Sequence, residues 1–138
     1  MNLSRLFNSA GLIGAVLSLA SLPLHLLISH AQSVQLASII IAVIGAIYVG
    51  FALQLGSLRQ ILIEIGVASL FFGAALIGLW ANPWVIPVAY VAHGLWDFVH
   101  HDHSKLTKVP HWYPPFCAVY DWVFAAGLTA IWMSRTTI

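Results

Sequence analysis

The sequence predicts an all-α fold, a polytopic transmembrane helical bundle of about five spans that makes up a single domain over residues 1–138. Three observations predict this fold. Hydrophobic residues make up 61% of the chain, and the mean hydropathy is +0.94. Charged residues make up only 7% of the chain. A soluble domain has about 25%, so these few charges cannot solvate a globule of this size. Apolar stretches also recur at the length of about 20 residues that a helix needs to cross a bilayer.

The expected spans follow one another with short interruptions. Each span is an apolar stretch, and the breaks contain Gly, Pro, Asn or a run of polar residues. The last span begins at Pro115, which suits the first turn of a helix because its missing N–H costs nothing there. We expect spans at residues 9–28, 34–55, 58–80, 84–101 and 115–133.

The first apolar stretch also resembles a secretory signal peptide. Arg5 precedes it, and Ser29 and Ala31 imitate a small-x-small cleavage site after it. However, the stretch is longer than the apolar core of a typical signal peptide, and it contains Pro23 and His25. We therefore expect a retained membrane helix.

The few basic residues predict the orientation of the bundle. Four of them lie on one side of the expected topology: Arg5, Arg59, Lys105 and Lys108. Only Arg135 lies on the other side. Because basic residues favour the cytoplasmic side, we expect the N-terminus and the loop between the fourth and fifth spans in the cytoplasm. The net charge of +1 provides no basic surface for nucleic acid, so the expected partner is the lipid bilayer.

Small residues recur at every fourth position in the first two spans, which places them on one face of each helix. Such faces let helices approach closely within a membrane. They are compatible with a tight bundle, with a homo-oligomer and with ordinary use of small residues in membrane helices. The two sets are Ala10, Gly14 and Ser18, and Ala42, Ala46 and Gly50.

The fourth expected span carries a polar face. His93, Asp97, His100 and His101 stand at i, i+4, i+7 and i+8, so they share one side of a helix that is otherwise rich in Val, Ala, Leu and Phe. Ionisable side chains inside a membrane are costly unless they face the protein interior and have partners there. This face is therefore the leading candidate for a functional site.

Two other spans each contain one acid, Glu64 in the third and Asp121 in the fifth. A rise of ~1.5 Å per residue places Glu64 ~7 Å inward from Arg59, and Asp121 ~9 Å inward from Pro115. The same rise places His93 ~12 Å inward from His101. These similar depths predict that both acids join the polar face of the fourth span.

Imidazole and carboxylate groups are the usual nitrogen and oxygen ligands of iron, zinc and manganese. Ligands at i and i+4 of one helix can share a metal ion. A divalent cation would also offset the cost of burying the acids, since no expected span contains Lys. Two alternatives stay open: a metal-free site for protons or substrate, and purely structural polar contacts in which Glu64 extends towards Arg59.

The segment from Ala92 to Trp122 contains a set of spaced polar and aromatic residues: His93-x-x-Trp96-Asp97-x-x-His100-His101, Pro110-x-Trp112-Tyr113-Pro114-Pro115-x-Cys117 and Asp121, with Tyr48-Val-Gly50-Phe51-Ala52 and Glu64 outside it. This set resembles a family of small bacterial integral membrane proteins of unknown function, domain of unknown function 6010. The resemblance covers about two thirds of the chain, and it implies a membrane protein but no activity. The histidine spacing is also similar to half of the histidine boxes of membrane di-iron desaturases and hydroxylases, although Asp97 replaces a histidine and the other boxes are missing.

The sequence therefore favours a metal-dependent membrane enzyme that oxidises or hydrolyses a lipophilic substrate. The expected cofactor is a divalent metal, iron or zinc, and the expected location is the inner membrane of a bacterium. Glu64 and Asp121 are expected to be further ligands or general bases. The ligand candidates are His93, Asp97, His100 and His101. The competing interpretation is a small transporter, a proton- or cation-binding protein, or an accessory subunit of a larger membrane complex.

Overall fold

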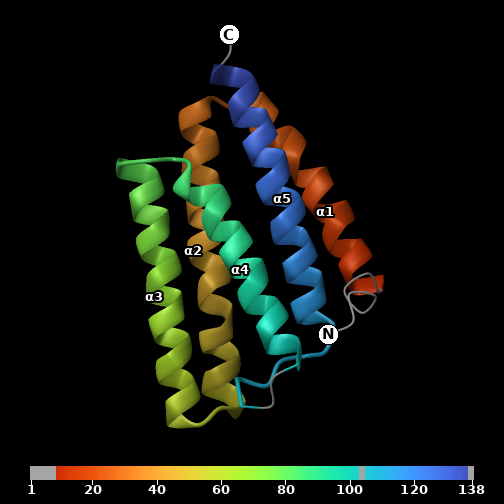
Figure 1. Cartoon of the computed structure of the whole chain (residues 1–138), viewed down its shortest axis with the longest axis vertical. Coiled ribbons are helices and arrows are strands. Elements are labelled where there is room, and N and C mark those ends of the chain that lie inside the picture. The colour runs from red at the N-terminus through yellow and green to blue at the C-terminus, as the bar shows by residue number, and fades with distance from the viewer. Residues whose placement is uncertain (1–8, 103–104, 137–138) are drawn as a thin grey trace.

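The computed structural model describes residues 9–102 and 105–136, and helices make up nearly all of this part of the chain (Figure 1). The predicted all-α bundle is confirmed, and the described residues contain no strand. The helices are α1 (Ser9–Leu27), α2 (His30–Leu55), α3 (Leu58–Trp80), α4 (Val85–Asp102) and α5 (Tyr113–Thr136).

Capping residues explain where two of the helices begin. Ser29 caps α2 and Ser57 caps α3, each with a reciprocal bond to the Gln three residues later. Such a capping box satisfies backbone N–H groups that the first turn leaves free. The cap at Ser29 starts α2 four residues before the expected start at Val34. The third helix has the predicted bounds.

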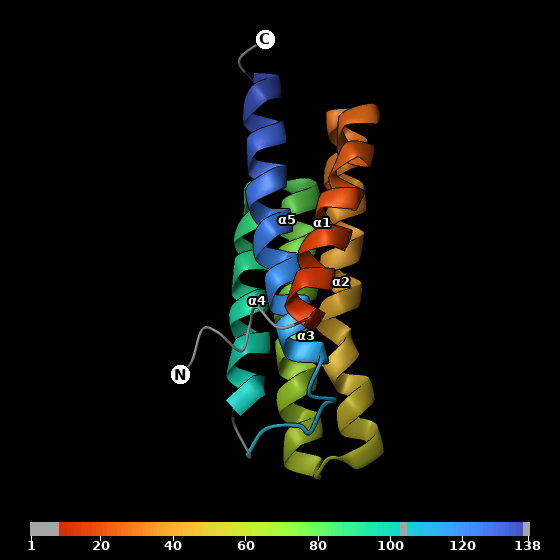
Figure 2. The same cartoon turned by 90° about the vertical axis from the view of Figure 1, so that its right-hand side faces the viewer.

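The helices run along one common axis, and α4 lies between α3 and α5 in Figure 1 and at one edge of the bundle in Figure 2. Helix α5 packs against both α1 and α4, and α2 packs against α3. Helix α4 also contacts α2 and α3. The polar face of α4 is therefore surrounded by protein.

Four helices, α1, α2, α3 and α5, are long and apolar enough to cross a membrane by length and composition. Their outer surfaces consist of side chains such as Leu27, Leu55 and Leu70, each more than 70% exposed. Three acids and three histidines are instead buried, which is the reverse of a soluble protein: Glu64, Asp97, Asp121, His25, His93 and His100. These four helices are typical of a membrane protein by length and composition. The expected fourth span, α4, is not among them, because its acids and histidines lower its hydropathy.

The small residues of the first expected span serve a contact within the chain. A side-chain carbon added at Gly14 would meet the backbone of α5 at Phe116. The close approach of α1 and α5 therefore requires glycine there. Gly50 of the second set has no atom within 4 Å of such a carbon, so its side of α2 is open.

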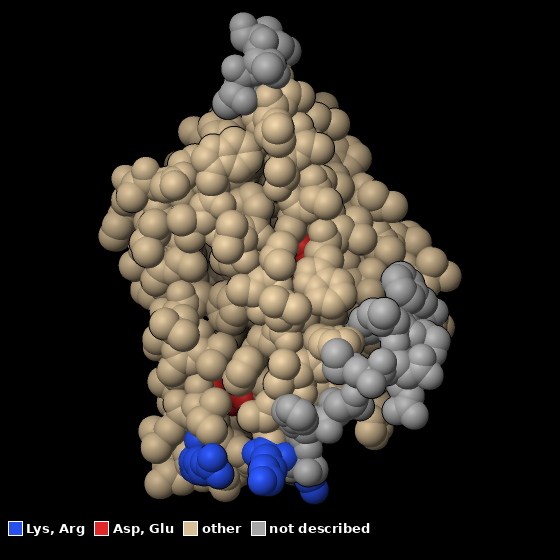
Figure 3. Space-filling model, in the orientation of Figure 1, with Lys and Arg blue, Asp and Glu red and all other residues tan. Residues whose placement is uncertain are grey.

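Basic residues separate to the two ends of the bundle. The Gln60 side chain at the start of α3 donates to the Leu106 carbonyl at 2.9 Å, which places the loop between α4 and α5 beside Arg59. At the opposite end, Arg135 donates to the carbonyl oxygen of His25 at 2.7 Å. Figure 3 shows basic atoms gathered at one end, with acidic atoms visible only as two small recessed areas. Arg5 lies outside the described residues.

Candidate metal site

Helices α4 and α5 together bury two acids and a histidine. His93 and Asp97 stand one turn apart on α4 and face Asp121 on α5, and all three side chains are at most 1% exposed. The two helices are close because Gly94 leaves room for the Trp122 ring of α5. The i, i+4 spacing and this close contact bring the three groups together.

The His93 ring is held between the two carboxylates. Its Nδ1 lies 2.6 Å from Oδ2 of Asp121 and 3.2 Å from Oδ2 of Asp97. The other oxygen of Asp97, Oδ1, accepts a hydrogen bond of 2.7 Å from the Tyr48 hydroxyl of α2. The three side chains each offer one ligand atom within 4.8 Å of the others. We call His93, Asp97 and Asp121 the triad site. Its residues come from α4 and α5, and Tyr48 of α2 bonds to it.

The triad site has unused bonding capacity. Nε2 of His93 and Oδ1 of Asp121 are buried and have no hydrogen bond to another described residue, and Oδ2 of Asp97 has only its 3.2 Å contact with Nδ1 of His93. Buried polar atoms without partners are rare and costly. The buried side chains of the described residues also include no Lys or Arg to balance the two carboxylates. One divalent cation with a neutral imidazole would make the site electrically neutral.

A second polar cluster lies nearer the α4–α5 loop. Nε2 of His100 lies 2.9 Å from Oε1 of Glu64, and the Thr107 hydroxyl donates to the same oxygen at 2.8 Å. Nδ1 of His100 lies 2.9 Å from the Trp96 carbonyl oxygen, which can only accept, so this nitrogen carries a hydrogen. Therefore one proton lies between His100 and Glu64, either on the imidazole or on the carboxyl group. We call this set the loop-end cluster (Glu64, His100 and Thr107).

Tyr48 joins the two clusters. Its ring centre is 4.3 Å from that of His100, while its hydroxyl binds Asp97. His100 is seven residues beyond His93 on α4, a separation of about 10 Å at ~1.5 Å per residue. The buried polar groups therefore form a continuous column along α4 at two depths.

The predicted residues thus fall into two groups instead of one. His93, Asp97 and Asp121 converge, whereas Glu64 and His100 pair with each other. Glu64 is 1% exposed and bonded to His100, so it does not extend towards Arg59. His101 is partly exposed, and its buried Nδ1 has no hydrogen bond to any other described residue.

Two contributors were not assigned a role by sequence. Tyr48 stood only among the residues of the resemblance; its hydroxyl bonds to Asp97, and its ring packs between helices. Thr107 stands in the polar loop, where threonine is unremarkable. Only its contact with Glu64 identifies it.

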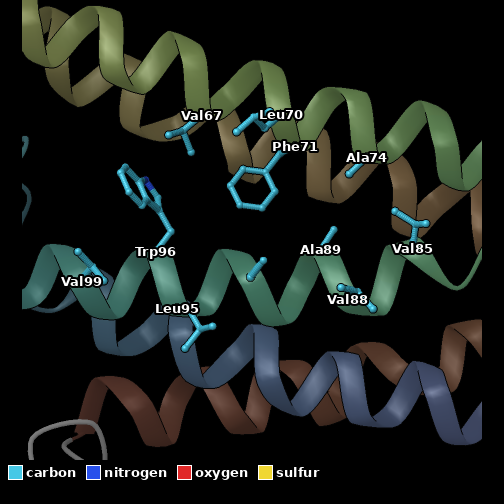
Figure 4. A pocket seen from close by; sticks show the side chains of 11 residues that line it. Val67, Leu70, Phe71, Ala74, Val85, Val88, Ala89, Leu95, Trp96 and Val99 are labelled. Atoms are coloured by element: carbon cyan, nitrogen blue, oxygen red, sulfur yellow. The ribbon is translucent and has the colours of Figure 1, made fainter.

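An apolar groove of about 540 Å³ separates α3 from α4 and opens to the outside of the bundle. Figure 4 shows Phe71 of α3 and Trp96 of α4 projecting into this gap. The ring centre of Phe71 is 4.9 Å from that of His93, and the centre of Trp96 is 4.7 Å from that of His100. Two aromatic side chains therefore form the wall between the groove and the two polar clusters.

Comparison with known proteins places the chain in a family. No curated protein and no solved structure matches it. A family model described as a family of unknown function, DUF6010, matches residues 10–135, which include both polar clusters. The chain therefore belongs to the DUF6010 family.

Proposed function

We propose that this protein is a metal-dependent membrane enzyme. In this proposal the triad site holds a divalent iron or zinc ion through Nδ1 of His93 and one carboxylate oxygen each of Asp97 and Asp121. The observation that carries the proposal is the convergence of two buried carboxylates and an imidazole with unpaired atoms and without a buried Lys or Arg among the described residues.

The spacing of the ligand atoms supports this proposal. Tetrahedral bonds of about 2.0 to 2.1 Å separate neighbouring ligand atoms by about 3.3 Å. Nδ1 of His93 is 3.2 Å and 2.6 Å from the two carboxylate oxygens, so of these two distances only the shorter needs to open, by less than ~1 Å. Nδ1 binds a metal only without its hydrogen, which can move to the unpaired Nε2.

Three protein ligands would leave a coordination position for water or substrate, as in catalytic metal sites. Zinc would activate a water for hydrolysis, whereas iron would support oxidation. The groove would receive the hydrocarbon chain of a substrate dissolved in the bilayer, with Phe71 between it and His93. Glu64, already sharing a proton with His100, would exchange protons during the reaction.

We place the protein in the inner membrane of a bacterium with its N-terminus in the cytoplasm, on the basis of the positive charges near the α4–α5 loop. The loop-end cluster would then face the cytoplasm. A homo-oligomer is compatible with the open face of α2 at Gly50.

Elemental analysis of the protein purified in mild detergent tests the metal site. We expect about one iron or zinc per chain. Asp97→Asn and Asp121→Asn should each remove most of the metal, whereas His111→Ala, an exposed histidine, should not. The absence of metal after growth and reconstitution with both ions would refute the proposal, as would equal losses in all three variants.

The column of polar groups favours a second function, proton transfer without a metal. Glu64 and His100 share a proton, and Tyr48 packs its ring against His100 and donates its hydroxyl to Asp97. Such a chain of acids and histidines is typical of proton relays in membrane proteins. Purified protein in vesicles with an enclosed pH-sensitive dye would distinguish the two. Proton flux in metal-free protein that is lost in Glu64→Gln supports the relay, and no flux excludes it.

A further inference from the structure

We infer that the groove between α3 and α4 binds an anionic lysophospholipid, a lipid with one hydrocarbon chain, an ester, a free hydroxyl and a charged phosphate. This inference rests on the proposed function, because it names the class of substrate that the groove would receive. The groove and its loop end offer a partner for each of these chemical groups.

The groove is long enough for a hydrocarbon chain. On α4 its lining extends from Val85 to Val99, a length of about 21 Å at ~1.5 Å per residue. The hydrocarbon layer of one leaflet is about 15 Å thick, half of the ~30 Å core. Figure 4 shows Ala74 of α3 opposite Ala89 of α4, so small side chains keep this part of the groove open. A chain that lies parallel to the helices therefore fits.

Polar atoms without partners lie at the loop end of the groove. Val67 is the lining residue of α3 nearest that end, and Glu64 stands about one turn beyond it on the same face. Trp96 lines the groove from α4, and both Trp96 and Glu64 contact His100. Nε1 of Trp96 and Oε2 of Glu64 are buried, and neither has a hydrogen bond of good geometry to another described residue. One donor and one acceptor are therefore left for a ligand.

An ester beside a hydroxyl suits these two atoms. The carbonyl oxygen of an ester only accepts, so it matches the N–H of Trp96, whereas a hydroxyl can donate to the free oxygen of Glu64. A lysophospholipid carries an ester and a hydroxyl on its glycerol. In a lipid with two chains a second ester replaces the hydroxyl, and a free fatty acid would bring a negative charge against Glu64. The two unpaired atoms therefore favour a lipid with one chain.

Basic side chains at the same end provide the partner of the phosphate. Arg59 is exposed in the first turn of α3, five residues before Glu64. Lys105 and Lys108 are exposed on either side of Thr107 in the sequence, and Thr107 donates to Glu64. Figure 3 shows basic atoms gathered at this end. In the proposed orientation this end meets the cytoplasmic leaflet, whose anionic lipids attract basic segments.

Native mass spectrometry of the protein in mild detergent tests this inference, with lysophosphatidylglycerol as the probe and any metal first removed by a chelator. We expect saturable binding of one lipid per chain. Lysophosphatidylcholine should bind roughly 10-fold more weakly, because its choline balances the charge of the phosphate. Trp96→Phe keeps a ring but removes the N–H, and it should weaken binding roughly 2- to 10-fold.

A matched pair of variants tests the place of binding. Ala92 is exposed and lines the groove, so Ala92→Phe should fill the groove and abolish saturable binding. Ala46 is also exposed, but it lies on α2 outside this groove, so Ala46→Phe should bind the lipid as the unaltered protein does. Unsaturable binding of several lipids per chain, equal in the two variants, would show annular lipid only and overturn the inference.

Two comparisons need only the unaltered protein, so they hold even if Ala92→Phe fails to fold. Equal affinities for lysophosphatidylglycerol and lysophosphatidylcholine would overturn the assignment of the phosphate to the basic residues. Equal affinities for lysophosphatidylglycerol and phosphatidylglycerol, which has two chains, would overturn the assignment of the hydroxyl to Glu64.

The lipid and the metal are tested separately, because lipid binding is measured without metal. A protein that holds zinc or iron but binds no lysophospholipid would overturn this inference and leave the metal site intact. Saturable lipid binding by a protein that never holds metal would refute the proposed metal-dependent enzyme and leave the lipid site intact.

Discussion

Replacing Tyr48 with Phe removes one hydroxyl from the centre of the polar column and leaves the buried ring in place. The hydroxyl donates to Oδ1 of Asp97 at 2.7 Å, and the two side chains are at most 1% exposed. Hydrogen bonds between side chains of membrane helices contribute about 0.6 kcal/mol on average and up to about 1.7 kcal/mol. Because its acceptor is a carboxylate, this hydrogen bond should contribute near the upper end of that range. Tyr48→Phe should therefore lower the free energy of unfolding by about 1.5 kcal/mol.

The same change should weaken metal binding. Loss of a group that orients a ligand costs about 10- to 100-fold in metal affinity. Tyr90→Phe is a matched control, because Tyr90 is equally buried but donates to a neutral backbone carbonyl, that of Ala37, at 2.9 Å. It should cost about 0.6 kcal/mol of stability and leave metal affinity unchanged.

The measurements are unfolding in detergent micelles and competition titration with a zinc or cobalt indicator. A double-mutant cycle of Tyr48→Phe with Asp97→Asn should give a coupling free energy of about 1 to 1.5 kcal/mol. A coupling near zero would show that the bond does not stabilise the fold. Equal metal affinities for Tyr48→Phe and Tyr90→Phe would refute the role of Tyr48 in orienting Asp97.

Three further predictions address other parts of the fold. Glu64→Ala leaves the His100 ring without its carboxyl partner, and it should lower the free energy of unfolding by about 3 kcal/mol. Glu64→Gln should lower it far less. Equal losses of stability for the two variants in unfolding assays would exclude the shared proton. Gly14→Ala forces a carbon against the α5 backbone and should cost about 1 to 3 kcal/mol. Gly50→Ala meets nothing and should be neutral or stabilising, and the same unfolding assay checks both. Reporter fusions should place Lys108 in the cytoplasm and Ile138 outside, and both on one side would refute the crossing of the membrane by the fifth span.

The helices were predictable because hydropathy and breaking residues act locally. The third span has the expected bounds, since Ser57 and Gln60 cap its start and an apolar run continues to Trp80. The second helix begins earlier than hydropathy suggests, because the capping box at Ser29 includes polar residues in its first turn. Hydropathy predicts which residues lie in the membrane, whereas the cap determines where the helix begins, because it bonds to the free backbone N–H groups of the first turn.

The candidate site was predictable in part. The i, i+4 spacing correctly placed His93 and Asp97 on one face, because both belong to one helix. Depth correctly paired Asp121 with them, but it also placed Glu64 at the same site. Depth specifies the height of a residue in the membrane and not its direction around the helix, so it did not distinguish His93 from His100 as the partner of Glu64.

The sequence by itself determined the class of this protein, its helices, and the presence of acids and histidines too costly to leave in lipid. Only the tertiary structure decided which of these groups meet. It separated the triad site from the loop-end cluster and connected them through Tyr48. The reason is physical: composition and periodicity act within a single helix, whereas contacts between helices depend on their packing. Gly14 and Gly94 set that packing by allowing α5 to lie close to both α1 and α4.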